Sequence, residues 1–467
     1  MPSSSPSPLL DQTLRAVARR YRVGEMPAAN GVEDGAEDSD PAMALAIAIE
    51  EARAAVQAGA APPTTSARLF TGALARLIRN ALRERGGDSA FQAMVLRHRY
   101  VLVREHASLS AHASADRRAV RTAVDAFAHP GKRRAMPAGP LADALEQMHA
   151  ASADGQWSAL TRCAAHLLAA TPAKEDAHSA LAAGLGKLLR EPALARLRRL
   201  DELARDPGVQ RYQSLWERQG PRPGTPEAAA RGATARQRGD AVEAMAEKAM
   251  SALAAHLVRA TGEIYRVATS LRVPASIPGN ADRAKTEWDV ALLRQAGADA
   301  SPVWDVCLLV EAKASTDAAT TDLPRLLRGL RLLAHADPHV TYAFESHQGP
   351  VRLRGASLAA LTTDEASLAT TVLYFSDAPA EALPRLLSAA GRMQLLSAQE
   401  SLAYACLLAD GKVPDTHLLE PVWEQLLVSP RWSAVLNQLP LLRQVRDLMV
   451  HAADLHAAIQ GLGASTP

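Results

Sequence analysis

Residues 303–315, VWDVCLLVEAKAS, close an apolar run with a glutamate and a lysine, and they constrain the fold more than any other segment. The continuously apolar stretch 306–310 predicts a strand in the centre of a sheet. This part of the chain therefore combines strands with helices. Glu311 and Lys313 emerge side by side at the end of that strand, where unpaired charges are costly. The two side chains therefore need a charged or hydrogen-bonding partner, or they have a functional role.

A second strand is predicted at 286–294, TEWDVALLR, one turn before the first, and residues 264–273 favour a third. Because side chains alternate along a strand, Asp289 can bring a second carboxylate to the neighbouring Glu311. The same alternation places Asp305 on the face of Glu311. Six residues separate the two on one strand, so Asp305 lies about 20 Å from that carboxylate. The predicted partner of Glu311 is therefore Asp289.

The predicted site offers hard oxygen ligands, the carboxylates of Asp289 and Glu311 and the backbone carbonyl of Ala312, which suit Mg²⁺ or Mn²⁺. Such an ion polarises a scissile phosphate and lowers the pKa of a bound water. Lys313 could orient or deprotonate that water and offset charge on the phosphate. The pattern predicts a site of phosphodiester hydrolysis. The alternative is that Glu311 and Lys313 form a strand-end ion pair of little consequence.

At these residues the chain resembles the PD-(D/E)xK nuclease superfamily, whose signature is an aspartate on one strand and (D/E)xK on the next. The matches are Asp289 within TEWDVALL and Glu311-Ala312-Lys313 within LLVEAKAS, and the resemblance covers residues 238–377. It implies a restriction-endonuclease-like αβββαβ core with a mixed central sheet. It also implies a nuclease dependent on Mg²⁺ or Mn²⁺ that acts on nucleic acid, with DNA favoured over RNA, in defence or repair.

The resemblance extends to the helices that flank these strands. Many members carry a further glutamate on the helix before the first strand, and Glu243 after Arg238-Gly239 fits that position as a third acidic ligand. Glu243 could equally be a solvated helix residue. Residues 322–336 match the helix after the motif, and 340–346 match the following strand. The arginines expected to contact nucleic acid are Arg236, Arg238, Arg325 and Arg328.

The rest of the chain is predicted to be helical, because alanine supplies much of the apolar content and aromatic residues make up only 4%. Helical spacing of apolar residues recurs through the first half and again near the C-terminus. The predicted organisation is a mobile N-terminal segment with an acidic linker (1–40), an all-helical domain (41–218), a basic Pro/Gly linker (219–239), the nuclease-like domain (240–380) and a helical C-terminal region (381–467).

Composition narrows the remaining possibilities. Three scattered cysteines, no apolar run long enough to span a membrane and no secretory signal favour a bacterial-type cytoplasmic protein. The first half lacks the alternating βα units of a barrel-type metabolic enzyme. The remaining rival is a non-catalytic scaffold on the nuclease fold that binds nucleic acid or protein. A homodimer or a protein partner bound through the helical regions is also compatible with the sequence.

Overall fold

The computed structural model describes residues 8–24, 40–134, 136–170, 176–221, 224–297, 302–381 and 385–464. Over these residues the fold is mixed α and β, 65% helical, with an open mixed sheet of seven strands. The predicted combination of many helices with a mixed sheet is confirmed. Contacts between Cα atoms divide the chain into a sheet unit (1–77, 223–400 and 415–467) and a helical unit (78–222 and 401–414).

The sheet is built around β3, the apolar segment expected in its centre. Strands β1, β2 and β3 pair antiparallel in chain order, and β6 runs parallel to β3 on its other side. Strand β7 extends the sheet beyond β6, and β5 and β4 add a small ribbon at the start of β3. The strands are β1 (Tyr265–Arg272), β2 (Glu287–Gln295), β3 (Trp304–Ala312), β4 (Thr341–Phe344), β5 (Val351–Arg354), β6 (Val372–Ser376) and β7 (Met449–His451).

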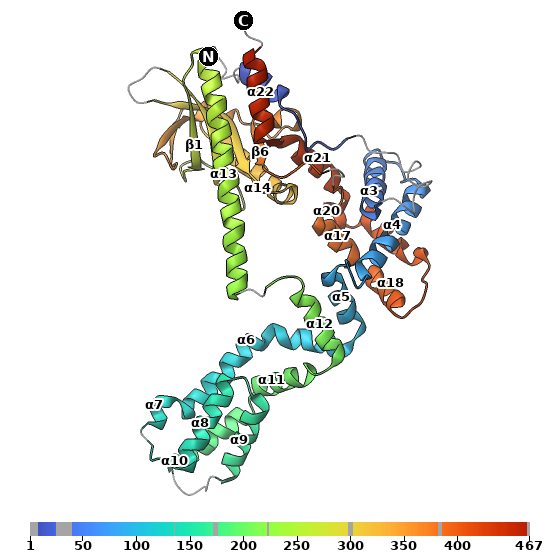
Figure 1. The fold of residues 1–467 in the computed structure, drawn as a ribbon, viewed down its shortest axis with the longest axis vertical. Helices are drawn as coiled ribbons and strands as arrows, with labels where there is room; N and C mark the ends of the chain where they lie inside the picture. Colours follow the sequence, from blue (N-terminus) through green and yellow to red (C-terminus); the bar gives the residue numbers. More distant parts are fainter. Residues whose placement is uncertain are drawn as a thin grey trace. The chain divides into compact units, whose positions relative to one another are not determined.

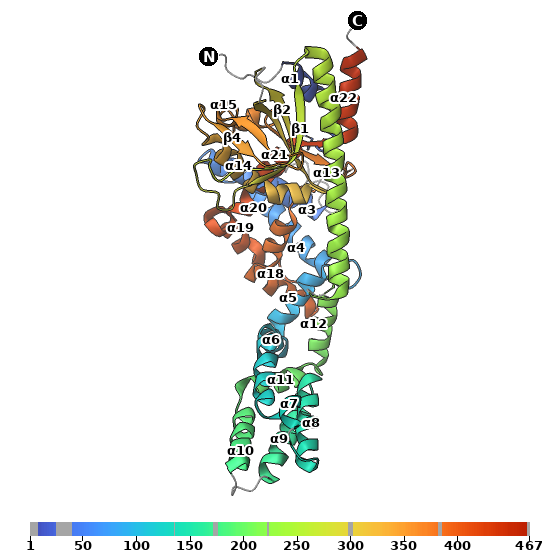
Figure 2. The same ribbon diagram turned by 90° about the vertical axis from the view of Figure 1, so that its left-hand side faces the viewer.

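Helices cover both faces of the sheet. On one face α13 (Pro226–Thr261) packs with α1 (Pro8–Ala16) and α22 (Ala452–Ala464) on a core that includes Val290, Val310 and Phe375. Figure 1 and Figure 2 show α13 running along β1 with α22 beside it. On the other face α14 (Thr316–Ala334) and α21 (Gln438–Leu448) pack on a core that includes Trp288 and Leu309.

The predicted basic linker at 219–239 is wrong over most of its length, because residues 226–239 form the first turns of α13. Thr225 caps this helix by accepting a hydrogen bond from the Ala228 amide, and Pro226 occupies the first turn. The alanines of this stretch favour a helix, and each internal glycine costs only about 1 kcal/mol against alanine. Helix α13 then continues to Gly262, whose positive φ of 70° ends it.

The predicted shared face of Asp305 and Glu311 is also wrong. The pairing of β2 with β3 shifts between Leu292 and Leu293, so that Cys307 is an extra residue on β3. Cys307 and Leu308 consequently face the same core, and the alternation reverses between Asp305 and Glu311. Asp305 instead pairs with Arg354 on β5. It lies apart from the candidate site, as its distance along the strand had suggested.

The strand that lies parallel beside β3 is not the one that follows α14 directly. Residues 341–344 form β4, which pairs with β5 at the sheet margin, whereas 372–376 form β6. The expected strand at 340–346 therefore exists but has a peripheral place. The short helices α15 (Gly355–Ala359) and α16 (Glu365–Leu368) connect β5 to β6.

The helical unit contains only helices among its described residues, as predicted for this part of the chain. Its main core lies among α6, α8, α9, α10 and α11, and a smaller one among α5, α6 and α12. Its helices are α5 (Ser89–Arg99), α6 (Val101–Ala128), α7 (Pro130–Arg133), α8 (Pro140–Ala153), α9 (Trp157–Ala170), α10 (Asp176–Leu189), α11 (Pro192–Leu203) and α12 (Pro207–Glu217).

The division between the units differs from the predicted boundary at residue 41. Residues 41–77 belong to the sheet unit, because Met43 and Ala46 pack against Leu386, Leu439 and Leu442. Residues 401–414 belong to the helical unit. The helices not yet given are α3 (Pro41–Gln57), α4 (Thr64–Leu82), α17 (Ala389–Leu396), α18 (Gln399–Ala409), α19 (Glu420–Val428) and α20 (Ser433–Leu436), with 3-10 turns η1 (Thr416–Leu419) and η2 (Pro430–Trp432).

Two predictions about the chain as a whole remain. The expected mobile segment and acidic linker at 1–40 fall largely outside the described residues, apart from α1, the residues up to Gly24 and Asp40. Within the described part of the chain, every helix is too short or too polar to cross a lipid bilayer.

Candidate active site

The predicted Asp289, Glu311 and Lys313 meet where β2 begins and β3 ends. Val290 pairs with Val310, so one further step of the antiparallel register sets Asp289 opposite Glu311. Lys313 follows the last residue of β3, and its Nζ lies 3.0 Å from Glu311 Oε2 and 4.0 Å from Asp289 Oδ2. Glu311 is fully buried, while Asp289 and Lys313 are partly exposed. Two carboxylates and an ammonium thus share the end of a strand pair.

Ala312 joins the site through its amide. Its N–H donates a hydrogen bond of 2.8 Å to Asp289 Oδ2, which fixes that carboxylate against the edge of β3. The ligand role expected for the Ala312 carbonyl stays a prediction.

Lys285 is a central site residue that sequence reasoning missed. It precedes β2, is only 5% exposed, and its Nζ donates a hydrogen bond to Glu311 Oε2. The same ammonium lies 3.7 Å from Asp289 Oδ1. One signal was available, since lysine is rare in this chain and Lys285 stands four residues before Asp289. We refer to Lys285, Asp289, Glu311 and Lys313 as the charged cluster.

Asp322 and Tyr374 support the charged cluster from α14 and β6. The Asp322 carboxylate lies 3.9 Å from Lys313 Nζ and accepts a hydrogen bond of 3.3 Å from the Tyr374 hydroxyl. Tyr374 is paired with Glu311 in the parallel register of β3 and β6. Lys313 is therefore held between carboxylates on two sides.

Burial and neighbouring charge shift the pKa values of this site. Burial raises the pKa of Glu311 to about 7, reinforced by Asp289 and opposed by the two lysines. Burial alone would lower the pKa of Lys313, but the carboxylates around it, Glu311 foremost, outweigh burial and raise it. Glu243 is exposed on α13, and partial desolvation, followed by the charge of Asp289, raises its pKa. Lys313 is accordingly a firmly charged ammonium.

A cavity of about 560 Å³ opens beside the charged cluster. Glu243 on α13 and Arg325 on α14 line it together with Lys285 and Asp289, so the predicted Glu243, Arg325 and Asp289 do come together. Glu287 also lines the cavity and is hydrogen-bonded to Ser270, a non-glycine residue with a positive φ of 52°. The remaining lining residues are Asp240, Ala244, Glu247, Thr269, Ser270 and His347.

The other predicted nucleic-acid contacts are more dispersed. Arg236 and Arg238 are exposed on α13, and Arg238 lies 3.5 Å from the Asp377 carboxylate. Arg328 is exposed on α14, where its Nε donates a hydrogen bond of 2.9 Å to the Arg283 carbonyl. Only Arg325 among these four arginines lines the cavity in the described part of the chain.

The site offers donor groups of the kind that bind a divalent cation, but its described residues do not form a complete coordination shell. Across the described residues, no three His, Cys, Asp or Glu side chains gather closely enough to hold a metal ion. Glu311 Oε1, however, is buried and accepts no hydrogen bond from any described residue. Asp289 and Glu311 together offer the oxygen ligands that Mg²⁺ or Mn²⁺ prefers. An orphaned carboxylate oxygen is consistent with a further ligand there.

Glu311 should make stability depend on pH. Its pKa rises from an ordinary 4.5 to about 7 on folding, so between these values the folded protein retains a proton that the unfolded chain releases. The stabilisation is complete below pH 4.5 and is lost as pH rises through 7, at up to about 1.4 kcal/mol per pH unit. Urea unfolding from pH 5 to 8 should show wild type losing stability relative to Glu311→Gln. A pH-independent difference would contradict this.

Gly329 on α14 has no side chain, and this leaves room for Lys285 to pack against the helix. A Cβ at position 329 would lie 2.6 Å from Lys285 Cβ and 2.8 Å from its carbonyl oxygen. Gly329→Ala should therefore destabilise the protein by about 1–3 kcal/mol, despite the helix preference of alanine. The matched control is Gly232→Ala in α13, where nothing lies within 4 Å and a gain of up to about 1 kcal/mol is expected. Urea denaturation compares the two, and equal effects would refute the close contact.

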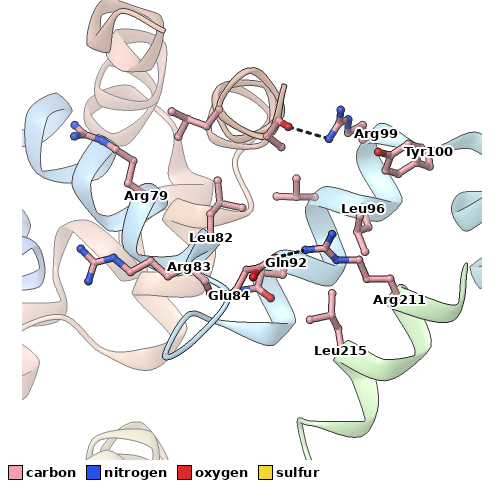
Figure 3. A pocket seen from close by; sticks show the side chains of 13 residues that line it. Arg79, Leu82, Arg83, Glu84, Gln92, Leu96, Arg99, Tyr100, Arg211 and Leu215 are labelled. Atoms are coloured by element: carbon pink, nitrogen blue, oxygen red, sulfur yellow. Dashed lines mark hydrogen bonds and ion pairs between the residues drawn. The ribbon is translucent and has the colours of Figure 1, made fainter. Parts of the chain in front are cut away.

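A second cavity, of about 410 Å³, lies within the helical unit. Figure 3 shows Arg99 reaching the end of α18, where it donates a hydrogen bond to the Ala409 carbonyl, and Arg211 turned toward Glu84. Arg211 Nη2 lies 3.7 Å from Glu84 Oε1. Its floor is aliphatic, with Leu82, Leu96 and Leu215. Glu84 is the one acidic residue among its described lining residues, so it lacks the paired carboxylates of the charged cluster.

Comparison with known proteins adds nothing to this geometry. A scan against protein-family models, a search of curated proteins and a search of solved structures each found no match.

Proposed function

We propose that this chain is a metal-dependent nuclease of the PD-(D/E)xK type that hydrolyses phosphodiester bonds, in DNA rather than RNA. The observation that carries the proposal is the opposition of Asp289 and Glu311 across β2 and β3, with Lys313 3.0 Å from Glu311 and with Asp289 lining a cavity. A phosphodiesterase needs two oxygen ligands and a cation near one phosphate, and this site supplies those groups.

The order of elements supports the restriction-endonuclease-like assignment. Helix α13, strands β1 to β3, helix α14 and strand β6 follow the expected αβββαβ order, with β6 parallel to β3. The ribbon of β4 and β5 is an insertion between α14 and β6 in this scheme. Asp289 on β2 and Glu311 on β3, with Lys313 directly after β3, are compatible with the signature.

Each residue of the site would have a distinct chemical role. Asp289 and Glu311 would hold the cation, which when bound polarises the scissile phosphate and lowers the pKa of the attacking water. Lys313 keeps its proton, because its pKa is raised, so it would orient that water and offset the negative charge that develops on the phosphate. Arg325, at the cavity wall, would bind a flanking phosphate.

The test is a cleavage assay of the purified full-length chain. Supercoiled plasmid, linear duplex, single-stranded DNA and RNA of one sequence are incubated with Mg²⁺, Mn²⁺ or EDTA. Cleavage of DNA that needs the metal and stops in EDTA is the expected result. Cleavage of RNA alone would change the substrate class, and cleavage that persists in EDTA would reject the metal-dependent mechanism.

One observation favours a second candidate, a non-catalytic scaffold on the same fold. Lys285 pairs with both carboxylates, and with Lys313 it balances their two negative charges. The charged cluster is therefore formally neutral without a metal ion. A scaffold of this kind would bind nucleic acid or a protein without cutting. Absence of cleavage on every substrate, together with DNA binding by wild type and by Asp289→Asn alike, would favour this candidate.

A further inference from the structure

Lys285 stands where a cation would balance the two carboxylates of the charged cluster. Its ammonium donates to Glu311 Oε2 and lies 3.7 Å from Asp289 Oδ1, and the side chain is 7% exposed. We propose that Lys285 is a tethered counter-cation that holds Asp289 and Glu311 together in the metal-free protein and withdraws when a divalent cation binds, so that it sets the metal concentration at which the site loads. This inference rests on the proposed function and names the regulation of that same site.

Charge balance favours the departure of one ammonium when a divalent cation binds. Lys285 and Lys313 together neutralise Asp289 and Glu311, so a divalent cation added to this arrangement would bring two excess positive charges into a buried site. Like charges at such distances repel strongly where water is largely excluded. Withdrawal of Lys285 removes part of that excess and leaves Lys313 as the remaining lysine donor to Glu311 Oε2.

Lys285 is better placed to leave than Lys313. Both backbone amides are anchored, that of Lys313 on the Phe375 carbonyl and that of Lys285 on the Arg325 carbonyl, but among the described residues only the Lys313 ammonium has a third carboxylate, Asp322, at 3.9 Å. Lys285 lies before β2 and already lines the cavity. Its side chain can therefore move into the cavity.

The cavity can receive the displaced ammonium. Its wall carries carboxylates besides Asp289, from Asp240, Glu243 and Glu247 on α13 and from Glu287 on β2. These acids can compensate the charge of Lys285 outside the cluster. The same wall gives Lys285 two alternative positions, one on Glu311 and one among these acids, which is what a metal-controlled exchange requires.

Metal affinity tests the exchange without depending on cleavage. Binding of Mn²⁺ is measured by titration calorimetry for the wild-type chain, Lys285→Met, Lys313→Met and Asp289→Asn. We expect Lys285→Met to bind Mn²⁺ about tenfold or more tightly than wild type, with a smaller gain in Lys313→Met, which removes the same charge without opening the Lys285 position. Asp289→Asn should lose most of the affinity. Equal affinity in wild type and Lys285→Met would overturn the inference.

A second measurement needs no substitution in the molecule observed. The ammonium resonance of Lys285, labelled with ¹⁵N and assigned by its absence in Lys285→Arg, is followed as Mg²⁺ is added to wild type. It should shift toward a solvent-exposed ammonium while the Lys313 resonance stays in place. If the metal binds and the Lys285 resonance does not shift, the inference is overturned but the proposed function is not. Failure of wild type and Lys285→Met to bind Mn²⁺ or Mg²⁺ would reject the proposed function and the exchange with it.

Discussion

Replacing Asp289 with asparagine is expected to slow phosphodiester cleavage by about a thousandfold or more, because the substitution removes an anionic metal ligand while keeping the size of the side chain. The asparagine carbonyl can still accept the hydrogen bond of 2.8 Å from the Ala312 amide. The fold should therefore survive. Lys313→Met should lose activity by about a hundredfold to a thousandfold, since it deletes the ammonium that offsets charge on the phosphate.

Two surface substitutions separate these losses from a general effect of charge. Asp282→Asn and Lys248→Met remove the same charges from exposed positions and should leave the rate within about threefold of wild type. Initial rates are measured at saturating Mg²⁺, with thermal unfolding of each variant as a check on folding. If folded Asp289→Asn cleaves within tenfold of wild type, the assignment of the site to Asp289 is wrong.

The strands around the site could be predicted because the local sequence of each one is typical of a buried strand. The apolar run that forms β3 and the neighbouring strand with Asp289 have the length and composition of buried strands, and antiparallel neighbours bring their ends together. Asp289, Glu311 and Lys313 meet for that reason. Glu243 reaches the same cavity because α13 packs along β1 and β2.

What could not be predicted depends on contacts between distant segments. Lys285 belongs to no motif, and its position follows from its packing on Gly329 of α14 and its hydrogen bond to Glu311. The extra residue at Cys307 leaves no local mark in the sequence, yet it reverses the side-chain alternation between Asp305 and Glu311. The extent of α13 was hidden by glycines in its exposed first turns, which a helix tolerates at modest cost.

Removing the Glu311 side chain is expected to destabilise the sheet unit more than any other single change in the charged cluster. Glu311→Leu leaves Lys285 buried without the carboxylate that accepts its hydrogen bond, and losing one partner of a buried pair costs about 3–5 kcal/mol. Asp289, 3.7 Å from the same ammonium, offsets part of that cost. Lys285→Met should cost less, because Glu311 keeps Lys313 at 3.0 Å and, with its pKa raised to about 7, can also take up a proton.

The double variant Lys285→Met with Glu311→Leu should recover most of the stability that Glu311→Leu loses. Both charges are then absent, and two apolar side chains of similar volume replace a pair whose desolvation cost nearly balances its attraction. Urea denaturation of the wild type, the two single variants and the double variant forms a closed cycle, from which the coupling between the two positions follows directly. A coupling of about 2 kcal/mol or more is expected. If instead the two losses simply add, Lys285 and Glu311 do not act as a pair, and the tethered ammonium does not hold the carboxylates of this site together.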